Sequence, residues 1–431
     1  MSTGKDILCQ KLQVLLDRRR REGRLYEPAS TDEFEGTVDF GSNDTLSLSS
    51  SGILTQAFLH QLERHPHFCV GSTAPRAFEG TKQYLVDIER DMSHFHGAEA
   101  GLFFPSGYEA NMAIWSSIPQ PGDFVVFDEL VHSSIREGMR LGRAKYIPFR
   151  HNDCRSLRQC LEDLQNQSTE VAEGKQVVFI ALESIYSMDG DVSPVHDFVK
   201  VAYDALPRGN YVLSIDEAHS NGIIGPNGSG VVCEYGLESE FAIRLHTCGK
   251  ALASAGAVVL CNETIKQGII NYARNVIFTT APTFVTVAAV RAGYEILTSD
   301  EGQKRRGRLQ QNIGYFYWTL TRHPRWEEMK QRGILYLPTE RIWDTGPFKS
   351  PIVPVITKAG QAGNLCKSLR RARFWVNSVE FPSVPKGTGR VRLMIHADNT
   401  QEEMDGVIHL IMKWAADRAG PAQPVELMAK M

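Results

Sequence analysis

The stretch LSIDEAHSNGIIG (213–225) decides the fold class, because an apolar run ends at an acidic residue and passes directly into a polar turn. Apolar runs of the same kind recur along the chain: GLFFP (101–105), DFVVF (123–127), QVVFIAL (176–182), YVLSID (211–216) and AGAVVLC (255–261). Runs without polar alternation are typical of strands buried on both faces of a sheet. We therefore predict a mainly parallel sheet.

Amphipathic segments separate these runs, as in SLRQCLEDL (156–164) and VHDFVKVAYDAL (195–206). Strand and helix in alternation predict an open α/β sheet with helices on both faces. Ligands of such sheets bind at the carboxyl ends of the strands. The residues just after each apolar run are therefore the first place to look for a functional site.

The chain divides into three predicted parts. Residues 1–50 form an N-terminal arm with a helix at about 5–22, residues 51–290 a large domain, and residues 291–431 a small C-terminal domain with a tail. The small domain is predicted to be α+β. Its expected elements, with the helix that links the two domains, are TFVTVAAVRAGYEIL (283–297), IVPVITK (352–358), a helix at about 361–372 and RVRLMIHA (390–397).

Composition excludes several functional classes. The 431 residues are 42% hydrophobic and 23% charged, and the net charge of −3 gives no indication of nucleic-acid or membrane binding. No apolar run reaches membrane-spanning length, and the N-terminus does not have the pattern of a secretory signal. The eight cysteines form no C-x-x-C pair, so we expect free thiols in a reducing compartment and no metal site.

The final tripeptide, Ala429-Lys430-Met431, resembles a peroxisomal import address. The alternative is a tail without function after Gly420-Pro421. A cytoplasmic or a peroxisomal location is therefore expected.

Asp216 stands at the end of a predicted buried strand, where a carboxylate needs a cationic or strongly donating partner. A protonated pyridinium nitrogen is such a partner, and His219 lies three residues further on, within reach of the same ring. An isolated aspartate at such a turn more often caps a helix. The assignment therefore depends on the other strand ends.

Lys250 lies in a turn of small residues within HTCGKALASAGAVVLC (246–261). A buried lysine amine has a lowered pKa and becomes a nucleophile toward an aldehyde, although a lone lysine is more often a surface residue. Thr247 offers a hydroxyl to a phosphate. In FFPSGYEANMAIW (103–115), Gly107 opens a predicted helix whose free amides suit a phosphate.

His132 follows another apolar run, in VFDELVHSSIREG (126–138), and its ring suits stacking on a flat heterocycle. An aldehyde-binding lysine, a pyridinium partner, a stacking ring and a phosphate cradle now stand past four different strands. Together they predict a site for pyridoxal 5'-phosphate (PLP), whose protonated ring withdraws electrons from a bound amino acid.

At these residues the sequence resembles the α-oxoamine synthases, over about residues 36–415, and is most similar to the 8-amino-7-oxononanoate synthase branch. The resemblance rests on the following motifs: FGSNDTLSLS, GSTAPRAFEGT, PSGYEANMA, ESIYSMDGDVSPV, DEAHSNGIIGPNGSG, TCGKA and VPKGTGRVRLMIHADNT. It implies the type I fold of PLP-dependent transferases, with a large mainly parallel-sheet domain and a small α+β domain.

The resemblance also implies a role for each matching position. Lys250 would hold PLP as a Schiff base and later move the substrate's α-proton, Asp216 would pair with the ring nitrogen, His219 with the phenolic oxygen, and His132 would stack on the ring. The remaining positions are implied as follows: Gly107, Tyr108 and Thr247 at the phosphate, Thr279 and Thr280 at the phosphate of a neighbouring subunit, Glu183 and Ser187 along cofactor and substrate, and Asn43 and Arg392 near the substrate carboxylate. A homodimer follows from the contact between subunits.

The implied reaction joins an α-amino acid to an acyl thioester, carried by CoA or a carrier protein, and releases CO₂ to give an α-amino ketone. L-alanine and a pimeloyl thioester, as in biotin synthesis, are the expected pair. The alternative is a secondary-metabolism synthase that uses a polyketide or fatty acyl thioester. Three departures from the family pattern, Thr45, Tyr84 and Asn377, concern the substrate rather than the cofactor.

Three further classes are considered. An aminotransferase shares the fold and the lysine but needs a keto-acid acceptor. A non-catalytic scaffold subunit is disfavoured by the presence of both Lys250 and Asp216. A dinucleotide-binding enzyme is disfavoured because no G-x-G-x-x-G follows the first strand.

Overall fold

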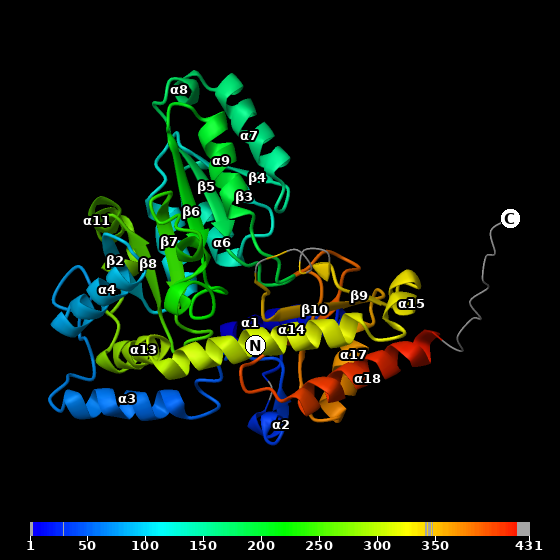
Figure 1. The fold of residues 1–431 in the computed structure, drawn as a ribbon. Helices are drawn as coiled ribbons and strands as arrows, with labels where there is room; N and C mark the ends of the chain where they lie inside the picture. Colours follow the sequence, from blue (N-terminus) through cyan, green and yellow to red (C-terminus); the bar gives the residue numbers. More distant parts are fainter. Residues whose placement is uncertain (1–2, 29, 341–342, 344–345, 347, 420–431) are drawn as a thin grey trace. The chain divides into compact units, whose positions relative to one another are not determined.

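The computed structural model describes residues 3–28, 30–340, 343, 346 and 348–419 (Figure 1). The chain forms two compact units, Met1–Val38 and Asp39–Met431. The tripeptide 429–431, on which the peroxisomal prediction rests, lies outside the described residues. All eight cysteines are free thiols, as the sequence predicts.

The first unit contains α1 (Gly4–Arg21) and α2 (Thr31–Phe34), and β1 (Val38–Asp39) stands at its boundary with the second. The predicted helix at 5–22 is thus confirmed. A capping box begins α1, because the Thr3 hydroxyl accepts the Asp6 amide and the Asp6 carboxylate accepts the Thr3 amide. Four arginines in its last turn suit the negative end of the helix dipole.

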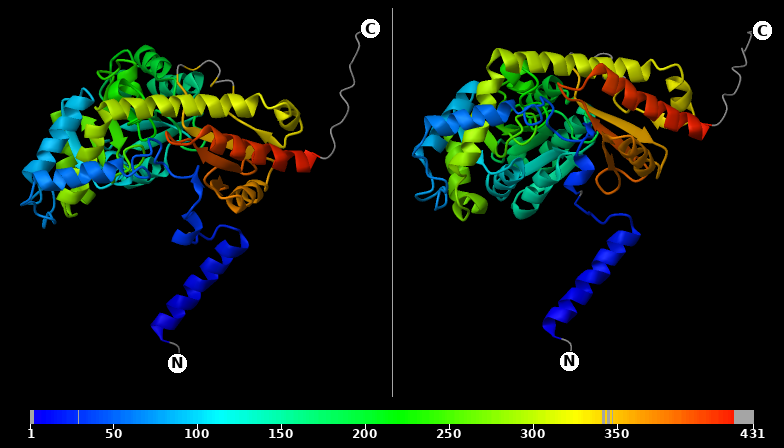
Figure 2. Two further views of the ribbon diagram at one scale, coloured as in Figure 1. Left: turned by 60° about the horizontal axis from the view of Figure 1, so that its bottom comes forward. Right: turned by 90° about the horizontal axis from the view of Figure 1, so that it is seen from below.

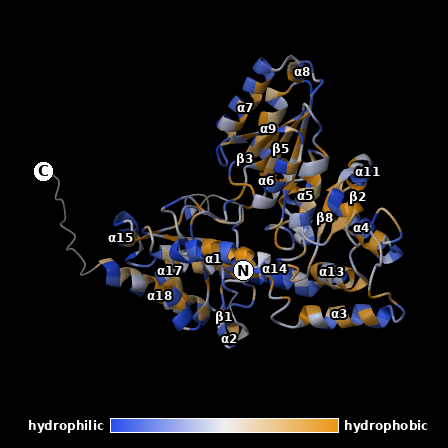
Figure 3. Ribbon diagram, turned by 180° about the vertical axis from the view of Figure 1, so that it is seen from behind, coloured by the Kyte–Doolittle hydropathy of each residue, from blue (hydrophilic) through white to orange (hydrophobic). Residues whose placement is uncertain are grey.

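A seven-stranded sheet forms the core of the second unit. Its strand order is β2 (Ala100–Phe104), β8 (Ala257–Cys261), β7 (Phe241–Thr247), β6 (Tyr211–Asp216), β5 (Val178–Glu183), β3 (Phe124–Asp128) and β4 (Lys145–Phe149). All neighbours from β7 to β4 are parallel, whereas β8 is antiparallel to both β2 and β7. The predicted mainly parallel sheet is confirmed. Figure 3 shows the hydrophobic colouring of β2 and β8, whose residues are all buried.

Two strands, β4 and β7, are absent from the predicted set. β4 is an edge strand whose residues are mostly exposed, so it carries no apolar run. β7 is buried but contains Arg244 and His246, which interrupt its apolar pattern. The polar pair matters for function, because β7 leads directly to Thr247 and Lys250.

Helices cover both faces of this sheet, as predicted. One face packs on α5 (Gly107–Ser117), α6 (Ser133–Leu141) and α11 (Glu263–Tyr272), which share one buried core with the strands. On the other face, Phe149 of β4 packs edge-on against Phe198 of α9 (Val195–Ala205), at 5.6 Å between ring centroids. The other helices of this domain are α3 (Ile53–Arg64), α4 (Gln83–Phe95), α7 (Cys154–Gln167), α8 (Thr169–Ala172), η1 (Pro226–Gly228), α10 (Val231–Glu234) and α12 (Arg274–Ile277).

Two helices follow one another toward the C-terminal part of the unit. α13 (Phe284–Leu297) confirms the helix predicted at 283–297. After a turn capped by Ser299, α14 (Asp300–Thr321) runs alongside α18 (Gln401–Ala419), as Figure 2 shows. The sequence prediction does not name α14, because its narrow apolar stripe lies within a mostly polar segment.

A four-stranded antiparallel sheet forms the C-terminal part. Its order is β12 (Asn377–Val379), β13 (Arg390–Met394), β10 (Ile352–Thr357) and β9 (Leu335–Tyr336). The remaining elements here are α15 (Trp326–Gln331), α17 (Ala362–Arg371) and β11 (Phe374–Trp375). The three elements predicted in this region are confirmed as β10, α17 and β13. No helix among the described residues is both long enough and apolar enough to cross a membrane.

Candidate active site

A polar cavity of about 150 Å³ lies at the carboxyl ends of β5, β6 and β7. Its lining is contributed by the strand ends and the loops that follow them: Gly107, Tyr108, Asn111, His132, Ser134, Glu183, Ser187, Asp216, Ala218, His219, Leu245, Thr247 and Lys250. Nine of the predicted site residues therefore meet in one cavity. Parallel strands bring them together because their carboxyl ends share one edge of the sheet.

Lys250 lies in the tight loop between β7 and β8. Hydrogen bonds from Ser254 N to Cys248 O (2.9 Å) and from Cys248 N to Gly256 O (2.8 Å) close this loop. Gly256 has φ +109°, and a Cβ there would lie 2.3 Å from the ring of Phe103, so only glycine fits. Burial lowers the pKa of Lys250 to about 8, although the charges of Asp216 and Glu183 oppose the shift.

Asp216, the last residue of β6, is 8% exposed. Its carboxylate accepts hydrogen bonds from the Asn111 side-chain amide and from the backbone amide of Ala218, both at 2.9 Å. Among the described residues, no lysine, arginine or histidine lies within ion-pair distance of it. A buried carboxylate that faces a cavity and has no direct ion-pair contact among the described residues fits a protonated ring nitrogen.

His132 caps the first turn of α6 beside the same cavity. Its backbone amide donates to the Glu183 carboxylate, and its Nδ1 lies 2.7 Å from the Ser134 hydroxyl. Burial lowers the pKa of His132, assisted by the charge of Lys250, which favours the neutral imidazole. A neutral flat ring held through its Nδ1 suits stacking against a heterocycle.

Glu183 and His219 are buried polar groups whose pKa values move in opposite directions. Burial and the neighbouring charge of Asp216, which is opposite Glu183 in the parallel register, raise the pKa of Glu183 well above its usual range. Burial and the charge of Lys250 hold the pKa of His219 well below its usual range. Glu183 is thus shifted toward its protonated form and His219 toward its neutral form.

The predicted phosphate cradle corresponds to the first turn of α5. Ser106 caps this helix by accepting the Glu109 amide at 3.2 Å, and Gly107 and Tyr108 are its first two residues. A Cβ on Gly107 would lie 3.5 Å from the Thr247 hydroxyl. The helix amides and the Thr247 hydroxyl therefore face one small space, which fits a phosphate.

Four of the predicted residues do not line this cavity. Arg392 of β13 is nearest, because its Nε donates to the Ser187 carbonyl at 2.6 Å, and burial lowers its pKa to about 10. Asn43 has a buried side-chain oxygen without a hydrogen-bond partner among the described residues. Thr279 and Thr280 are exposed, and Thr280 forms an isolated β-bridge with Pro75.

Four lining residues were missed by the sequence prediction, and two of them, Asn111 and Ser134, have polar side chains. The Asn111 amide donates to both Asp216 and the Ser134 hydroxyl, the latter at 3.0 Å, and so joins the Asp216 and His132 sides of the cavity. Asn111 is buried within the otherwise apolar face of α5. A lone amide on an apolar helix face is the signal that would have found it, because a buried amide requires partners.

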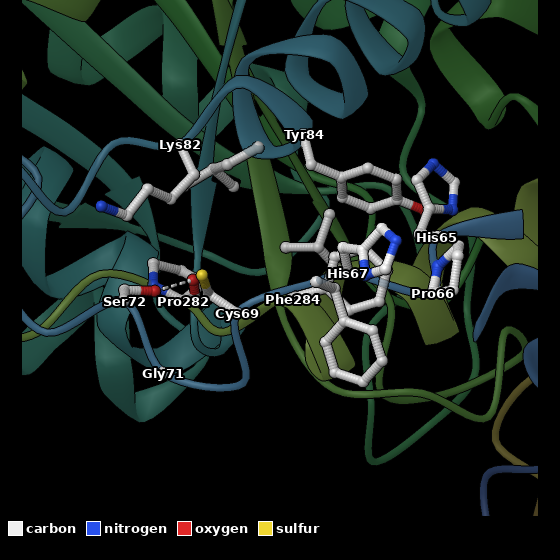
Figure 4. A pocket seen from close by; sticks show the side chains of 13 residues that line it. His65, Pro66, His67, Cys69, Gly71, Ser72, Lys82, Tyr84, Pro282 and Phe284 are labelled. Atoms are coloured by element: carbon white, nitrogen blue, oxygen red, sulfur yellow. Dashed lines mark hydrogen bonds between the residues drawn. The ribbon is translucent and has the colours of Figure 1, made fainter. Parts of the chain in front are cut away.

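A second cavity, of about 450 Å³, is mainly apolar and lies where α3, α4 and the start of α13 meet (Figure 4). Phe68 stacks on Phe284 at 4.4 Å between ring centroids, and Tyr84 lies 4.6 Å from the same ring. Lys82 also lines the cavity and lies away from the Phe284 ring in Figure 4. Tyr84, a departure from the family pattern, is therefore part of this cavity.

The chain is similar to known proteins over nearly its whole length. The family model Aminotransferase class I and II matches residues 35–411. Aminoacyl transferase sphA of Aspergillus fumigatus is 38% identical over 408 residues, 94% of this chain and 87% of that protein. The 8-amino-7-oxononanoate synthase of Emericella nidulans is 40% identical over 401 residues, 92% of this chain and 93% of that protein.

A solved structure shares the fold. The serine palmitoyltransferase of S. paucimobilis, with a bound PLP–myriocin aldimine, superposes with a TM-score of 0.76 at 24% identity, covering 95% of this chain and 97% of that one. The superposition shows that this chain shares the fold of that protein.

Proposed function

This chain is a PLP-dependent acyltransferase of the α-oxoamine synthase family, within the class I and II aminotransferases, and we propose that it condenses an α-amino acid with a long apolar acyl thioester. A carbon–carbon bond forms between the α-carbon and the acyl carbonyl, the thiol leaves, and the amino acid's carboxyl departs as CO₂. The product is an α-amino ketone. The observation that carries the choice of acyl group is the apolar cavity of Figure 4.

The residues of the polar cavity fit PLP. Lys250 would hold it covalently, Asp216 would pair with its ring nitrogen, and Gly107, Tyr108 and Thr247 would hold its phosphate. When bound, PLP supplies an electron sink for charge that develops at the amino acid's α-carbon. The chain's own contribution is position and proton transfer.

Lys250 is the group suited to moving the α-proton. Burial lowers the pKa of Lys250 to about 8, so part of the protein has a neutral Lys250 amine near neutral pH. The neutral amine is the form that can accept a proton. Asp216, oriented by two donors, would pair with the ring nitrogen of PLP. Arg392, which donates to the Ser187 carbonyl at the border of the cavity, would pair with the amino acid's carboxylate.

The apolar cavity is linked to the segment expected to reach a neighbouring subunit. The Ser72 hydroxyl donates to the Pro282 carbonyl at 2.7 Å, and the Ala281 amide donates to the Ala74 carbonyl at 2.9 Å. Thr279 and Thr280 immediately precede these residues. We infer that the cavity receives the acyl chain used at the partner subunit's site.

Two acyl groups, a fatty acyl chain and a pimeloyl group, are the candidates for this cavity. The apolar rings favour a fatty chain, and the structural neighbour is named for palmitoyl transfer. Lys82 on the cavity wall favours the second candidate, condensation of L-alanine with a pimeloyl thioester, because its ammonium would pair with the distal carboxylate. The Emericella nidulans relative carries the name of that activity.

An acyl series separates these candidates. We expect kcat/KM to rise from octanoyl to dodecanoyl to palmitoyl thioester, by about fourfold for each methylene that becomes buried, since each contributes ~0.8 kcal/mol. Phe284→Ala should flatten this dependence, whereas Tyr203→Ala, on the exposed surface of α9, should preserve it. Product is measured by mass spectrometry.

A second pair of substrates, pimeloyl and heptanoyl thioester, tests whether the acyl group is dicarboxylic. Pimeloyl thioester would then be used better than heptanoyl thioester by about fivefold, and Lys82→Met would remove the difference. A flat dependence on chain length together with a pimeloyl preference would overturn the long-chain proposal. It would leave the amino-acid side of the reaction intact.

We further propose that the active unit is a homodimer. Large apolar side chains are exposed around the predicted contact segment, including Phe278 at 70% and Tyr272 at 72%. Tyr108 of the phosphate cradle is itself 46% exposed. An exposed apolar patch beside an incomplete phosphate site is suited to a second copy of the chain.

Subunit mixing tests the homodimer. Lys250→Ala protein and Thr280→Ala protein should each have little activity, but their unfolded and refolded mixture should regain about a quarter of the wild-type rate, because half the dimers contain one intact site. A mixture no more active than its components, although dimeric by light scattering, would place Thr280 outside the partner's site.

A further inference from the structure

A charged cluster that the proposed chemistry does not use lies near Glu183, whose pKa is influenced by the charge of Asp128. His151 lies between two carboxylates: its Nδ1 is 2.9 Å from Asp128 and its Nε2 is 2.6 Å from Asp191. The side chains of Asp128 and Asp191 are 0% and 6% exposed. Burial alone would lower the pKa of His151, but hydrogen bonds and charges from both aspartates raise it to about 10.

The two carboxylates come from different parts of the fold. Asp128 ends β3 and also accepts the amides of Leu130 and Asn152 at 2.9 and 2.8 Å, which anchors it to the sheet. Asp191 belongs to a narrow turn after β5, closed by hydrogen bonds from Tyr186 N to Asp191 O (3.0 Å) and from Gly190 N to Tyr186 O (2.8 Å). His151 therefore fastens this turn, residues 186–191, to the large sheet. Asn152 assists it, because its side-chain amide also donates to Asp191, at 2.5 Å.

The opposite side of the 186–191 turn holds the small domain's arginines. Arg392 donates to the Ser187 carbonyl at 2.6 Å, and Arg390 pairs with the Asp189 carboxylate. The fit is close, because Gly190 has φ +68° and a Cβ there would lie 2.6 Å from the Ile352 carbonyl of β10. The turn is thus held between two sheets, with His151 on one side and Arg392 on the other.

We propose that His151 is a positioning residue for the substrate carboxylate: as a doubly hydrogen-bonded imidazolium it fixes the 186–191 turn, and the turn in turn fixes Arg392. The inference rests on the proposed function, because it assumes that Arg392 pairs with the amino acid's carboxylate. It predicts a defect confined to that carboxylate. PLP, held by other residues, should bind as before.

The experiment compares each amino acid with the amine that lacks its carboxylate. L-alanine against ethylamine, glycine against methylamine and serine against ethanolamine are titrated into the PLP-loaded protein, and binding is followed by the change in the visible absorption of PLP. The wild-type protein should bind one of the amino acids more tightly than its amine. The ratio of the two affinities measures the interaction with the carboxylate.

His151→Gln should lower that ratio about tenfold or more, because a small displacement of the Arg392 guanidinium weakens its pairing with the carboxylate. The affinity for the amine should stay unchanged. Asp191→Asn, which keeps the shape of the turn but removes a charge, should have the same effect if His151→Gln does not fold. His94→Gln, an exposed histidine of α4, is the matched control and should behave as wild type. Combining His151→Gln with Arg392→Ala should add nothing to Arg392→Ala alone.

The outcomes distinguish an error in the role of His151 from an error in the assignment of Arg392. Equal loss of amino acid and amine binding, or an unchanged ratio in both variants, overturns the role of His151. A wild-type protein that does not distinguish an amino acid from its amine instead overturns the assignment of Arg392. Neither result depends on which acyl thioester the enzyme uses.

Discussion

Lys250→Ala should abolish condensation, with a loss of about 10³-fold or more, because the variant lacks both the amine that attaches PLP and the base that moves the α-proton. PLP should still bind noncovalently, since Asp216, His132 and the α5 amides are unchanged. Borohydride reduction followed by mass spectrometry should find PLP on the Lys250 peptide of the wild type and on no peptide of the variant. Substantial turnover by Lys250→Ala would remove this lysine from the reaction.

The pKa of Lys250 gives a control that does not depend on turnover. In PLP-depleted protein, the neutral amine is the form that attacks an aldehyde, and its fraction rises with pH until the pKa, about 8, is passed. Capture of pyridoxal at Lys250 should therefore increase about tenfold per pH unit below 8 and level off above it.

Asp216→Asn should lower the condensation rate by about 10²- to 10³-fold, because the cavity would lose its charged partner for the ring nitrogen while the volume stays the same. The Asn111 amide would then face another amide instead of a carboxylate. The absorption spectrum of bound PLP should shift, as protonation of the ring is no longer favoured. The rate is measured by release of free thiol.

Asn111→Ala is the informative companion of Asp216→Asn. It keeps the charge and removes one of the two donors that orient it, so we expect a smaller loss, about tenfold, with little change in the spectrum. If Asp216→Asn retained full activity and an unchanged spectrum, the buried carboxylate would have a structural role only. The pairing with a ring nitrogen would then be wrong.

The sequence predicted those strands of the large sheet whose residues form an apolar run along the chain. Strands β2, β3, β5, β6 and β8 are continuous apolar runs, so their ends located Asp216 and the α5 cradle from sequence alone. β7 was not predicted, because its polar residues Arg244 and His246 are buried by partners that are distant in the chain. Arg244, for example, donates to the His96 carbonyl at 2.8 Å. A pattern confined to a few neighbouring residues does not contain that information.

The residues of the site also divide into those that a local sequence pattern predicts and those that it does not. Residues that follow strand ends were found, whereas Asn111, Ser134 and His151 were missed because their roles depend on contacts formed only in the folded chain, such as Asn111 with Asp216. Thr279 and Thr280 illustrate a different limit. Their predicted partner is another subunit, so a single chain leaves them exposed and the prediction stands as a prediction.

The most direct test of the central claim is the carbon balance of the reaction. PLP-loaded protein is incubated with palmitoyl thioester and with alanine, glycine or serine that carries ¹³C in the carboxyl group. We predict labelled CO₂, free thiol and an unlabelled α-amino ketone in equal amounts for one of these amino acids. Transfer of the amino group to a keto acid, with the label retained and no thiol released, would contradict it.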